Sequence, residues 1–174
     1  MAIRDMLLPE FDQEMANTRK MLERVPEDRF DFQPHPKSWK VDRLAGHVAD
    51  LPSWAAYTMQ TEILELEPNQ FSPFEPATRK ELLAKFDKSV SDAHEAIATA
   101  TDEQMNAIWT MKWEGKTIMN MPRIGVLRSV VMNHLIHHRA HLGMYLRLMN
   151  VAVPGMYGPS ADETPFGMDQ KQAA

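Results

Sequence analysis

Proline-rich stretches divide this chain of 174 residues into four segments, and this division limits the folds open to it. In each segment apolar residues recur at every third or fourth position, the spacing of a helix with one buried face. The segments cover about residues 3–24, 38–65, 78–97 and 122–149. Four amphipathic helices without a convincing sheet bury their apolar faces against one another. The sequence therefore predicts an all-α four-helix bundle.

Local signals place the ends of these helices and one irregularity. Ser38 or Asp42 can cap the second helix, and the run from Thr78 to Glu81 has the pattern of a capping box that opens the third. Pro122 suits the first position of the fourth helix. Pro52 lies inside the second segment, and proline lacks the N–H that would bond the carbonyl four residues back. We therefore expect a kink at Pro52.

The connecting segments differ in length and character. Residues 66–77 contain three prolines and form a loop. The length of this loop is typical of a crossover between helices that are not tight antiparallel neighbours. Within residues 102–122, the alternation around Trp109 indicates a short extended segment or a hairpin. A tail rich in proline and glycine follows the last helix. We expect one domain over residues 1–163 and a disordered tail over residues 164–174.

Composition excludes several classes of function. The chain has no cysteine, which excludes disulfides, thiolate nucleophiles, cysteine-type zinc sites and iron–sulfur clusters. Its net charge of −5 gives no reason to expect binding to nucleic acid or to an anionic membrane surface. No stretch has the apolar length of a membrane span, and the N-terminus lacks the features of a signal peptide. We expect a soluble cytoplasmic protein.

Four of the seven histidines fall within eight residues, namely His134, His137, His138 and His141. At about 100° per residue, His134, His138 and His141 share one helix face within about 60° of arc, while His137 points further round. His134 and His138 have the i, i+4 spacing that lets two imidazoles converge on one ion. This face continues the apolar stripe of the helix, so the histidines should point into the bundle. A polar group buried there is unfavourable unless it is paired or coordinated.

His47 interrupts the apolar face of the second helix in the same way. A single histidine of this kind is more often a hydrogen-bonded core residue than a ligand, and His35 and His94 have the context of surface residues. Interior-facing histidines from two helices are different, because neutral imidazoles in a cysteine-free interior have few other good partners. The pattern favours a metal site, with nitrogen and oxygen as the available ligand atoms.

Several motifs together resemble the DinB-like (DinB/YfiT-like) family over roughly residues 5–163. They are Pro34–Trp39, Leu44–Ala49, Asn133–Arg139, Tyr145–Arg147 and Val153–Glu163. The resemblance implies a four-helix bundle with an up-down-down-up arrangement, often as a homodimer. It also implies one divalent metal ion, usually zinc or nickel, with water completing the ligand shell. By motif, the ligands fall on His47, His134 and His138.

One position departs from the family pattern. Members similar to this chain generally have glutamine where His141 stands, one turn beyond the proposed ligands and on their face. His141 could be a fourth ligand, a partner of a water on the metal, or a neutral replacement. The last two readings are favoured, because the family works with three ligands.

Three imidazoles with open positions are typical of a catalytic metal site rather than a closed structural one. On the resemblance, the first hypothesis is a metal-dependent thiol transferase that acts on a small molecule and uses a low-molecular-weight thiol. The second is a metal-dependent hydrolase. The third is a non-catalytic, stress-associated protein stabilised by its metal. No general acid or base can be named from the sequence.

Other side chains could complete the site. Asp50, one turn from His47, could orient a ligand or be an ordinary capping or solvated carboxylate. Four aromatic residues could line a pocket near the metal, although aromatic residues at helical spacing more often belong to the core. They are Trp54, Tyr57, Trp109 and Trp113.

Overall fold

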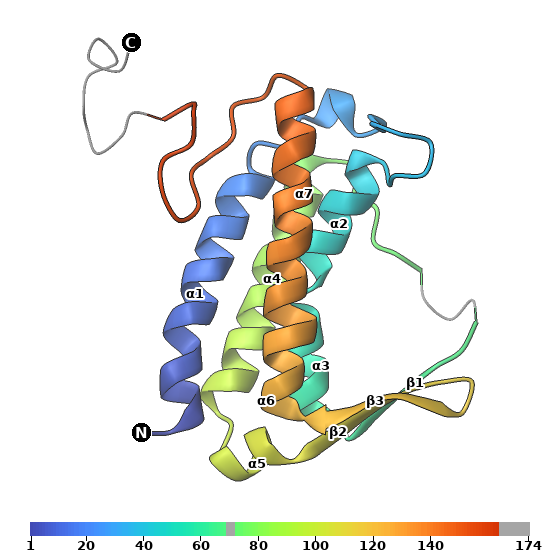
Figure 1. Ribbon diagram of the computed structural model, residues 1–174, viewed down its shortest axis with the longest axis vertical. Helices are drawn as coiled ribbons and strands as arrows, with labels where there is room; N and C mark the ends of the chain where they lie inside the picture. The colour runs from blue at the N-terminus through green and yellow to red at the C-terminus, as the bar shows by residue number, and fades with distance from the viewer. Residues whose placement is uncertain (69–71, 164–174) are drawn as a thin grey trace.

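The computed structural model describes residues 1–68 and 72–163, and four long helical elements run lengthwise through it (Figure 1). They are α1 (Ile3–Leu22), α2 (Val41–Asp50) continued by α3 (Ser53–Gln60), α4 (Arg79–Ala98), and the continuous run of α6 (Arg123–Val126), η2 (Leu127–Asn133) and α7 (His134–Leu148). In Figure 1 the chain ascends α1, descends α2 and α3, descends α4 and ascends α7. The expected up-down-down-up bundle is thereby confirmed.

The two descending elements are parallel neighbours, so a crossover must connect them. The chain returns from the strand β1 (Ile63–Leu66), at the lower end of the bundle, to the start of α4 at the upper end (Figure 1). At that start, Thr78 Oγ1 accepts a hydrogen bond of 3.1 Å from the Glu81 amide. The Glu81 carboxylate accepts from the Ala77 amide at 2.9 Å. The crossover and the capped start of the third helix are therefore as predicted.

The second helix is divided at Pro52 rather than merely kinked. The helix α2 ends with a hydrogen bond of 3.0 Å from the Leu51 amide to the His47 carbonyl. Pro52 has no N–H to continue this pattern, and α3 begins at Ser53. The interruption falls one turn after His47, so that α2 ends close to the site described below.

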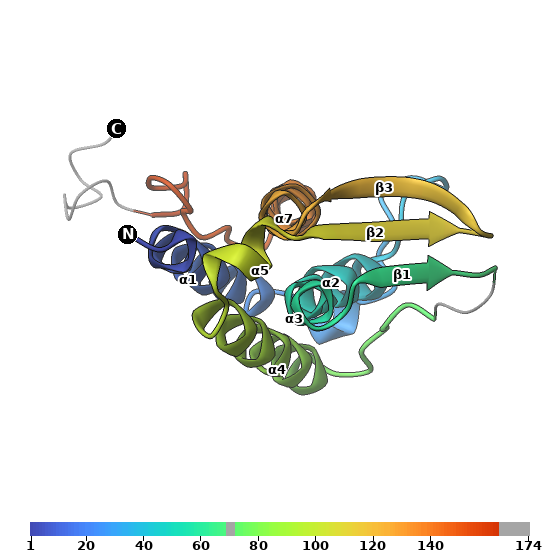
Figure 2. The ribbon, with the colours of Figure 1, turned by 90° about the horizontal axis from the view of Figure 1, so that it is seen from below.

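A small three-stranded sheet corrects the prediction of an all-α protein. Besides β1 it contains β2 (Ile108–Trp113) and β3 (Lys116–Pro122), in the order β1-β2-β3. β1 pairs with β2 in parallel, and β2 pairs with β3 as the antiparallel hairpin that the sequence indicated. Glu114 and Gly115 have φ angles of 46° and 76° in the turn, which suits a two-residue hairpin loop. Figure 2 shows the three strands side by side beyond the helices.

The remaining short elements are η1 (Glu27–Arg29) and α5 (Asp102–Asn106). Pro122 ends β3 and caps α6 instead of occupying the first helical position, a shift of one residue from the prediction. The seven residues of η2 are π-helical, which the sequence pattern did not indicate. Single turns of this kind within α-helices are frequent at functional sites.

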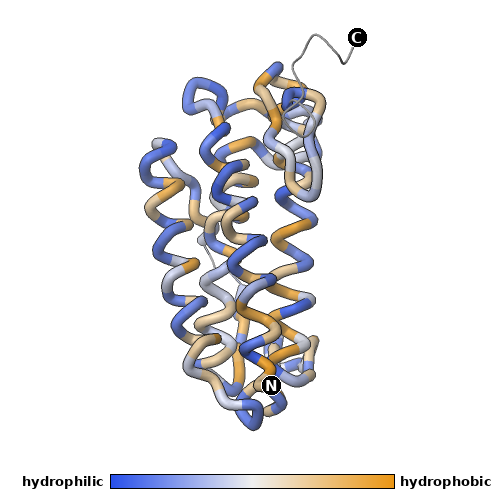
Figure 3. The backbone as a smooth tube through the Cα atoms, turned by 90° about the vertical axis from the view of Figure 1, so that its left-hand side faces the viewer, coloured by the Kyte–Doolittle hydropathy of each residue, from blue (hydrophilic) through white to orange (hydrophobic). Residues whose placement is uncertain are grey.

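Apolar side chains from all four helical elements fill the interior. Fully buried members include Phe11, Leu22, Leu82, Phe86, Leu127 and Leu135. Figure 3 shows hydrophilic and hydrophobic positions alternating along each helix, as expected for helices with one buried face. Among the described residues, no helix combines the length and the apolar character that crossing a membrane requires.

The segment after α7 folds back on α1. Asn17 Nδ2 donates a hydrogen bond of 3.1 Å to the Met156 carbonyl. The Tyr157 hydroxyl lies 2.9 Å from Glu14 Oε1 and accepts from Arg139 Nη2 at 2.7 Å. The predicted disordered tail, residues 164–174, lies outside the described residues.

Candidate metal centre

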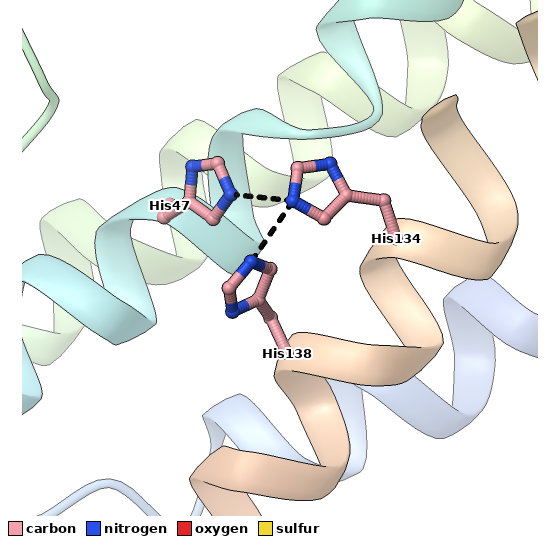
Figure 4. A group of neighbouring side chains, drawn as sticks. All are labelled: His47, His134 and His138. Atoms are coloured by element: carbon pink, nitrogen blue, oxygen red, sulfur yellow. Dashed lines mark hydrogen bonds between the residues drawn. The ribbon is translucent and has the colours of Figure 1, made fainter. Parts of the chain in front are cut away.

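The structure brings His47, His134 and His138 together between α2 and α7 (Figure 4). The Nε2 atom of His134 lies 3.4 Å from that of His47 and 2.9 Å from that of His138. The ring centroids of His47 and His138 are 4.7 Å apart. The predicted set of three imidazoles from two helices is therefore a real cluster in the fold.

The surroundings of all three histidines favour their neutral form. Burial, together with the nearby His134, lowers the pKa of His47 to about 4. Burial likewise lowers the pKa of His138 to about 3, with the adjacent histidines adding to the effect. The pKa of His134 is also lowered, chiefly by burial, although a hydrogen bond with the backbone of Val130 partly offsets this. Neutral imidazoles carry the free lone pair that a metal ligand needs.

Local backbone structure orients the ring of His134. The π-helical η2 ends at Asn133, directly before His134, and it contains Val130. Because the ring of His134 donates an N–H to that backbone, its Nε2 lone pair faces the other two rings. On the other side, α2 stops soon after His47 because of Pro52.

The separations of the ring nitrogens fit a single ion. Two nitrogens that each lie about 2.0–2.1 Å from one zinc ion are about 2.9 Å apart at a right angle, and about 3.4 Å apart at the tetrahedral angle. The observed separations of 2.9 Å and 3.4 Å match these values. With neutral donors and suitable spacing, the residues present fit one divalent cation.

Trp39 is a site residue that the sequence reasoning missed. Its ring stacks on His138, with centroids 5.5 Å apart and an angle of 15° between the planes, and it meets His47 edge-on at 5.3 Å. The Tyr145 hydroxyl donates to the Trp39 carbonyl at 3.3 Å. His138 Nδ1 is buried and has no hydrogen-bond partner among the described residues, so stacking orients this ring. Only its place in the motif Pro34–Trp39 could have pointed to this tryptophan.

Asp50 does not orient His47 through a hydrogen bond in the described structure. Its carboxylate forms an ion pair of 2.7 Å with Lys85 of α4 and accepts a hydrogen bond of 3.1 Å from Ser53. Arg43, one turn before His47 on α2, lies over the Trp39 ring, with Cζ 5.0 Å from the centroid. Its positive charge contributes to the lowered pKa of His47.

Two cavities of similar size flank the histidines on either side of Trp39. The first, of about 230 Å³, includes Trp39, Arg43, His47, Asp50, Pro73 and Phe74 in its wall. The second, of about 220 Å³, includes Lys37, Ser38, Trp39, Leu44, His138, His141 and Tyr145. Each cavity thus reaches one histidine of the cluster and Trp39. A larger cavity of about 340 Å³ lies between α3 and α4, but no histidine lines it.

His141 lies outside the three-histidine cluster. Its ring is 4.2 Å from that of His137, centroid to centroid, and 5.7 Å from that of His138. His137 and His141 are exposed, and with His138 they form a second group whose ring nitrogens lie within 4.8 Å of one another. This position on the wall of the second cavity suits a residue that contacts a bound molecule.

The four aromatic candidates divide into two pairs. Trp54 and Tyr57 line a small cavity of about 110 Å³ together with Asp50, so they lie near the site. Trp109 is fully buried and donates its indole N–H to Thr61 Oγ1 at 3.1 Å. Trp113 is 42% exposed at the end of β2. The last two belong to the sheet and not to the cavities described above.

An up-down-down-up bundle with an inward-facing histidine cluster defines a class of helical proteins with a candidate metal site. Within that class the chain belongs to the DinB family, whose model matches residues 3–171. Residues 5–163, on which the sequence motifs rested, lie wholly within this match.

The chain is similar to several known proteins. The uncharacterized protein YrdA of Bacillus subtilis is 23% identical over 170 residues, which cover 95% of each chain. A DinB-like protein of Bacillus cereus superposes with a TM-score of 0.66 at 22% identity, over 86% of this chain and 95% of that one. YfiT of B. subtilis, described as a probable metal-dependent hydrolase, superposes with a TM-score of 0.64 at 16% identity, over 86% and 89%. The two superpositions show a shared fold.

Proposed function

We propose that this protein is a metal-dependent enzyme that transfers a low-molecular-weight thiol to a small acceptor molecule. His47, His134 and His138 would hold one divalent ion, with zinc or nickel as the expected occupant. The observation that carries the proposal is the pair of cavities on either side of Trp39, each reaching one of the candidate ligands. Group transfer requires two substrates beside one centre, and two cavities provide room for both.

The donor set supports this chemistry. When bound, a divalent ion supplies Lewis acidity, which deprotonates a coordinating thiol outright and lowers the pKa of a coordinating water towards neutral pH. Three neutral imidazoles leave the positive charge of such an ion undiminished. Because the chain has no cysteine, the thiol must come from a small molecule. In the transfer, a bond forms between the thiol sulfur and an electrophilic carbon, while the thiol proton and the leaving group depart.

The chain's own residues suit a thiol better than water. Hydrolysis of an amide or an unactivated ester is accelerated by a group that protonates the departing nitrogen or oxygen. Asp50, the carboxylate nearest in sequence to the three histidines, is already paired with Lys85 and Ser53. A thiol bound at the centre needs no separate base. The side chains that shape the site therefore act mainly to hold and orient two molecules around Trp39.

Hydrolysis is the second candidate, and the observation that favours it is the description of YfiT as a probable metal-dependent hydrolase. The same three histidines would serve, with water in place of the thiol. The third function is a non-catalytic role in which metal only stabilises the bundle. The experiment must distinguish this role from the two catalytic ones.

The test compares both reactions in one preparation. Zinc-loaded protein would be assayed with glutathione or cysteine and the electrophile 1-chloro-2,4-dinitrobenzene, and separately with p-nitrophenyl acetate. We expect metal-dependent conjugation that is lost in His134→Ala and kept in His94→Ala, because His94 lies on α4 and is exposed. Ester hydrolysis without any thiol requirement would favour the hydrolase. Bound metal with neither activity would favour the structural role.

A further inference from the structure

The cavity on the α2 side of Trp39 combines an apolar wall with charged groups. Trp39 and Phe74 supply aromatic surface, while Arg43, His47 and Asp50 supply polar groups. Its volume of about 230 Å³ lies below the range of about 300–1,000 Å³ that is usual for drug-sized ligands. A small organic molecule therefore fits this cavity better than a peptide or a nucleotide does.

Within the described residues, one cation of this wall has no carboxylate to pair with. Asp50 and Lys85 form an ion pair of 2.7 Å, so their charges balance each other. Among residues 1–68 and 72–163, no carboxylate forms an ion pair with the guanidinium of Arg43. This guanidinium lies over the Trp39 ring at 5.0 Å, a contact that orients the group without neutralising it. The balance of charge at the cavity therefore favours an anion.

The placement of Arg43 directs this charge towards the candidate metal centre. Arg43 and His47 lie four positions apart on α2, so their side chains lie on the same helix face. A guanidinium presents a planar fork of N–H donors that matches the two oxygens of a carboxylate. A carboxylate held by Arg43 would thus place the rest of its molecule one helical turn away, beside His47.

The opposite wall depends on a close approach of the crossover segment to α2. A Cβ atom added at Gly46 would lie 2.0 Å from the carbonyl oxygen of Phe74, so only glycine permits this contact. Phe74 is thereby held next to the helix face that carries Arg43 and His47. The ring of Phe74 also contacts Lys85, whose ammonium lies 5.9 Å from the ring centroid.

We propose that this cavity binds the acceptor substrate, and that this acceptor is a small carboxylate with an apolar body. Arg43 holds the carboxylate, and Trp39 and Phe74 flank the apolar body. The reactive carbon then lies beside His47, His134 and His138. This assignment rests on the proposed transferase function and adds to it the chemical class of one substrate, with Arg43 as the residue that determines specificity.

The test uses phenylacetate and its neutral isostere phenylacetamide as probes. Binding of each to zinc-loaded protein would be measured by calorimetric or NMR titration, in the wild type and in Arg43→Gln. We expect phenylacetate to bind at least about tenfold more tightly than the amide, since a hydrogen-bonded charge contributes at least this much. Arg43→Gln should remove most of that preference and leave amide binding unchanged. Arg43→Lys should retain part of it.

Matched controls separate this inference from the proposed function. Arg24→Gln removes an exposed arginine at the end of α1 and should change neither affinity. Arg43→Gln should still carry its metal, as measured by elemental mass spectrometry. Titration of the metal-free protein tests whether the preference depends on Arg43 alone. No binding of phenylacetate, or equal binding by wild type and Arg43→Gln, would overturn the assignment, even with the metal site intact. Wild-type protein that binds no metal would instead overturn the proposed function.

Discussion

His138 and Arg139 are neighbours on α7 whose side chains serve opposite sides of the bundle. His138 faces α2, where it meets His47 and Trp39. Arg139 faces α1, is 2% exposed, and forms an ion pair of 2.7 Å with the buried Glu14. It also donates hydrogen bonds to Thr18 Oγ1 and the Glu14 carbonyl, both at 3.0 Å. The helix that carries the candidate ligands is thus fixed to its neighbour by a buried charge network.

Breaking this network should destabilise the fold strongly. In Arg139→Met, Glu14 stays buried without its cation, so the free energy of unfolding should fall by about 3–5 kcal/mol. Denaturant titration would measure this fall. The control Lys88→Met removes an exposed ion pair with Asp92 and should lower the free energy of unfolding by at most about 0.5 kcal/mol. Adding Glu14→Gln to Arg139→Met should recover part of the loss. Equal effects in the two single variants would contradict the assigned role of Arg139.

The lowered pKa values of the histidines predict how the metal-free protein responds to pH. Well above pH 6.5, His47 and His138 are neutral in both the folded and the unfolded chain. Below it, the unfolded chain takes up protons that the folded chain resists, because the folded pKa values are about 4 for His47 and about 3 for His138. The free energy of unfolding should therefore fall between pH 6.5 and 4, by at most about 1.4 kcal/mol per pH unit for each histidine.

Thermal or denaturant unfolding of the metal-free protein at pH 7.5, 6 and 5 would measure this slope. Replacing His47 and His138 with glutamine should make the slope shallower, since these residues no longer titrate. A slope that is the same in wild type and in the double variant would show that the two rings are not buried as the structure places them.

The clustering of the three histidines was predictable from the sequence, but the residues around them were not. The i, i+4 spacing of His134 and His138 indicates convergence on one ion because helix geometry is local. The positions of Trp39 and Arg43 beside the histidines depend on how the segment before α2 packs against α7. No local sequence pattern indicates this packing. The ion pair between Asp50 and Lys85 likewise joins two helices distant in sequence. The motif that resembles the DinB family contained Trp39 without indicating its role.

At the scale of elements, the backbone of the crossover segment approaches α2 closely at Gly46. Gly46→Ala places a methyl group against the backbone of Phe74, and backbone cannot move aside as a flexible side chain does. We expect a net loss of about 1–2 kcal/mol in the free energy of unfolding despite the better helix propensity of alanine. Affinity for a ligand in the cavity lined by Phe74 should fall as well.

Gly143→Ala is the matched control, since its added methyl group meets the flexible end of Met21 at 3.3 Å. This variant should be neutral or slightly stabilising. Denaturant titration of both variants provides the comparison. If Gly46→Ala were as stable as Gly143→Ala, the crossover would not pack on α2 as described.

The elements that the sequence missed share a physical reason. β1 has only four residues, and its partner strand β2 begins more than forty residues later, so neither length nor periodicity marks it. No local pattern in the sequence separates the seven residues of the π-helical η2 from the α-helices on either side of it. By contrast, the break at Pro52 follows from a missing N–H, a property of one residue. A feature that depends on one residue could be predicted from the sequence, whereas pairing between segments distant in sequence could not.

At the scale of the whole molecule, the candidate metal centre joins two of the four helical elements. The α2 and α7 helices contribute one and two histidines, and Trp39 lies against the rings from both. An ion bound there would cross-link these helices, and it would stabilise the folded chain in proportion to its affinity. The homodimer, the cytoplasmic location and the choice between zinc and nickel stay predictions.

The most direct test of the central claim is the metal content of the purified protein, prepared without a histidine tag. Elemental mass spectrometry should find about one divalent ion per chain in the wild type after incubation with zinc or nickel. The ion should be lost in His47→Ala, His134→Ala and His138→Ala and retained in His94→Ala. Wild-type protein that binds no metal, or single variants that bind it as the wild type does, would contradict the three-histidine site.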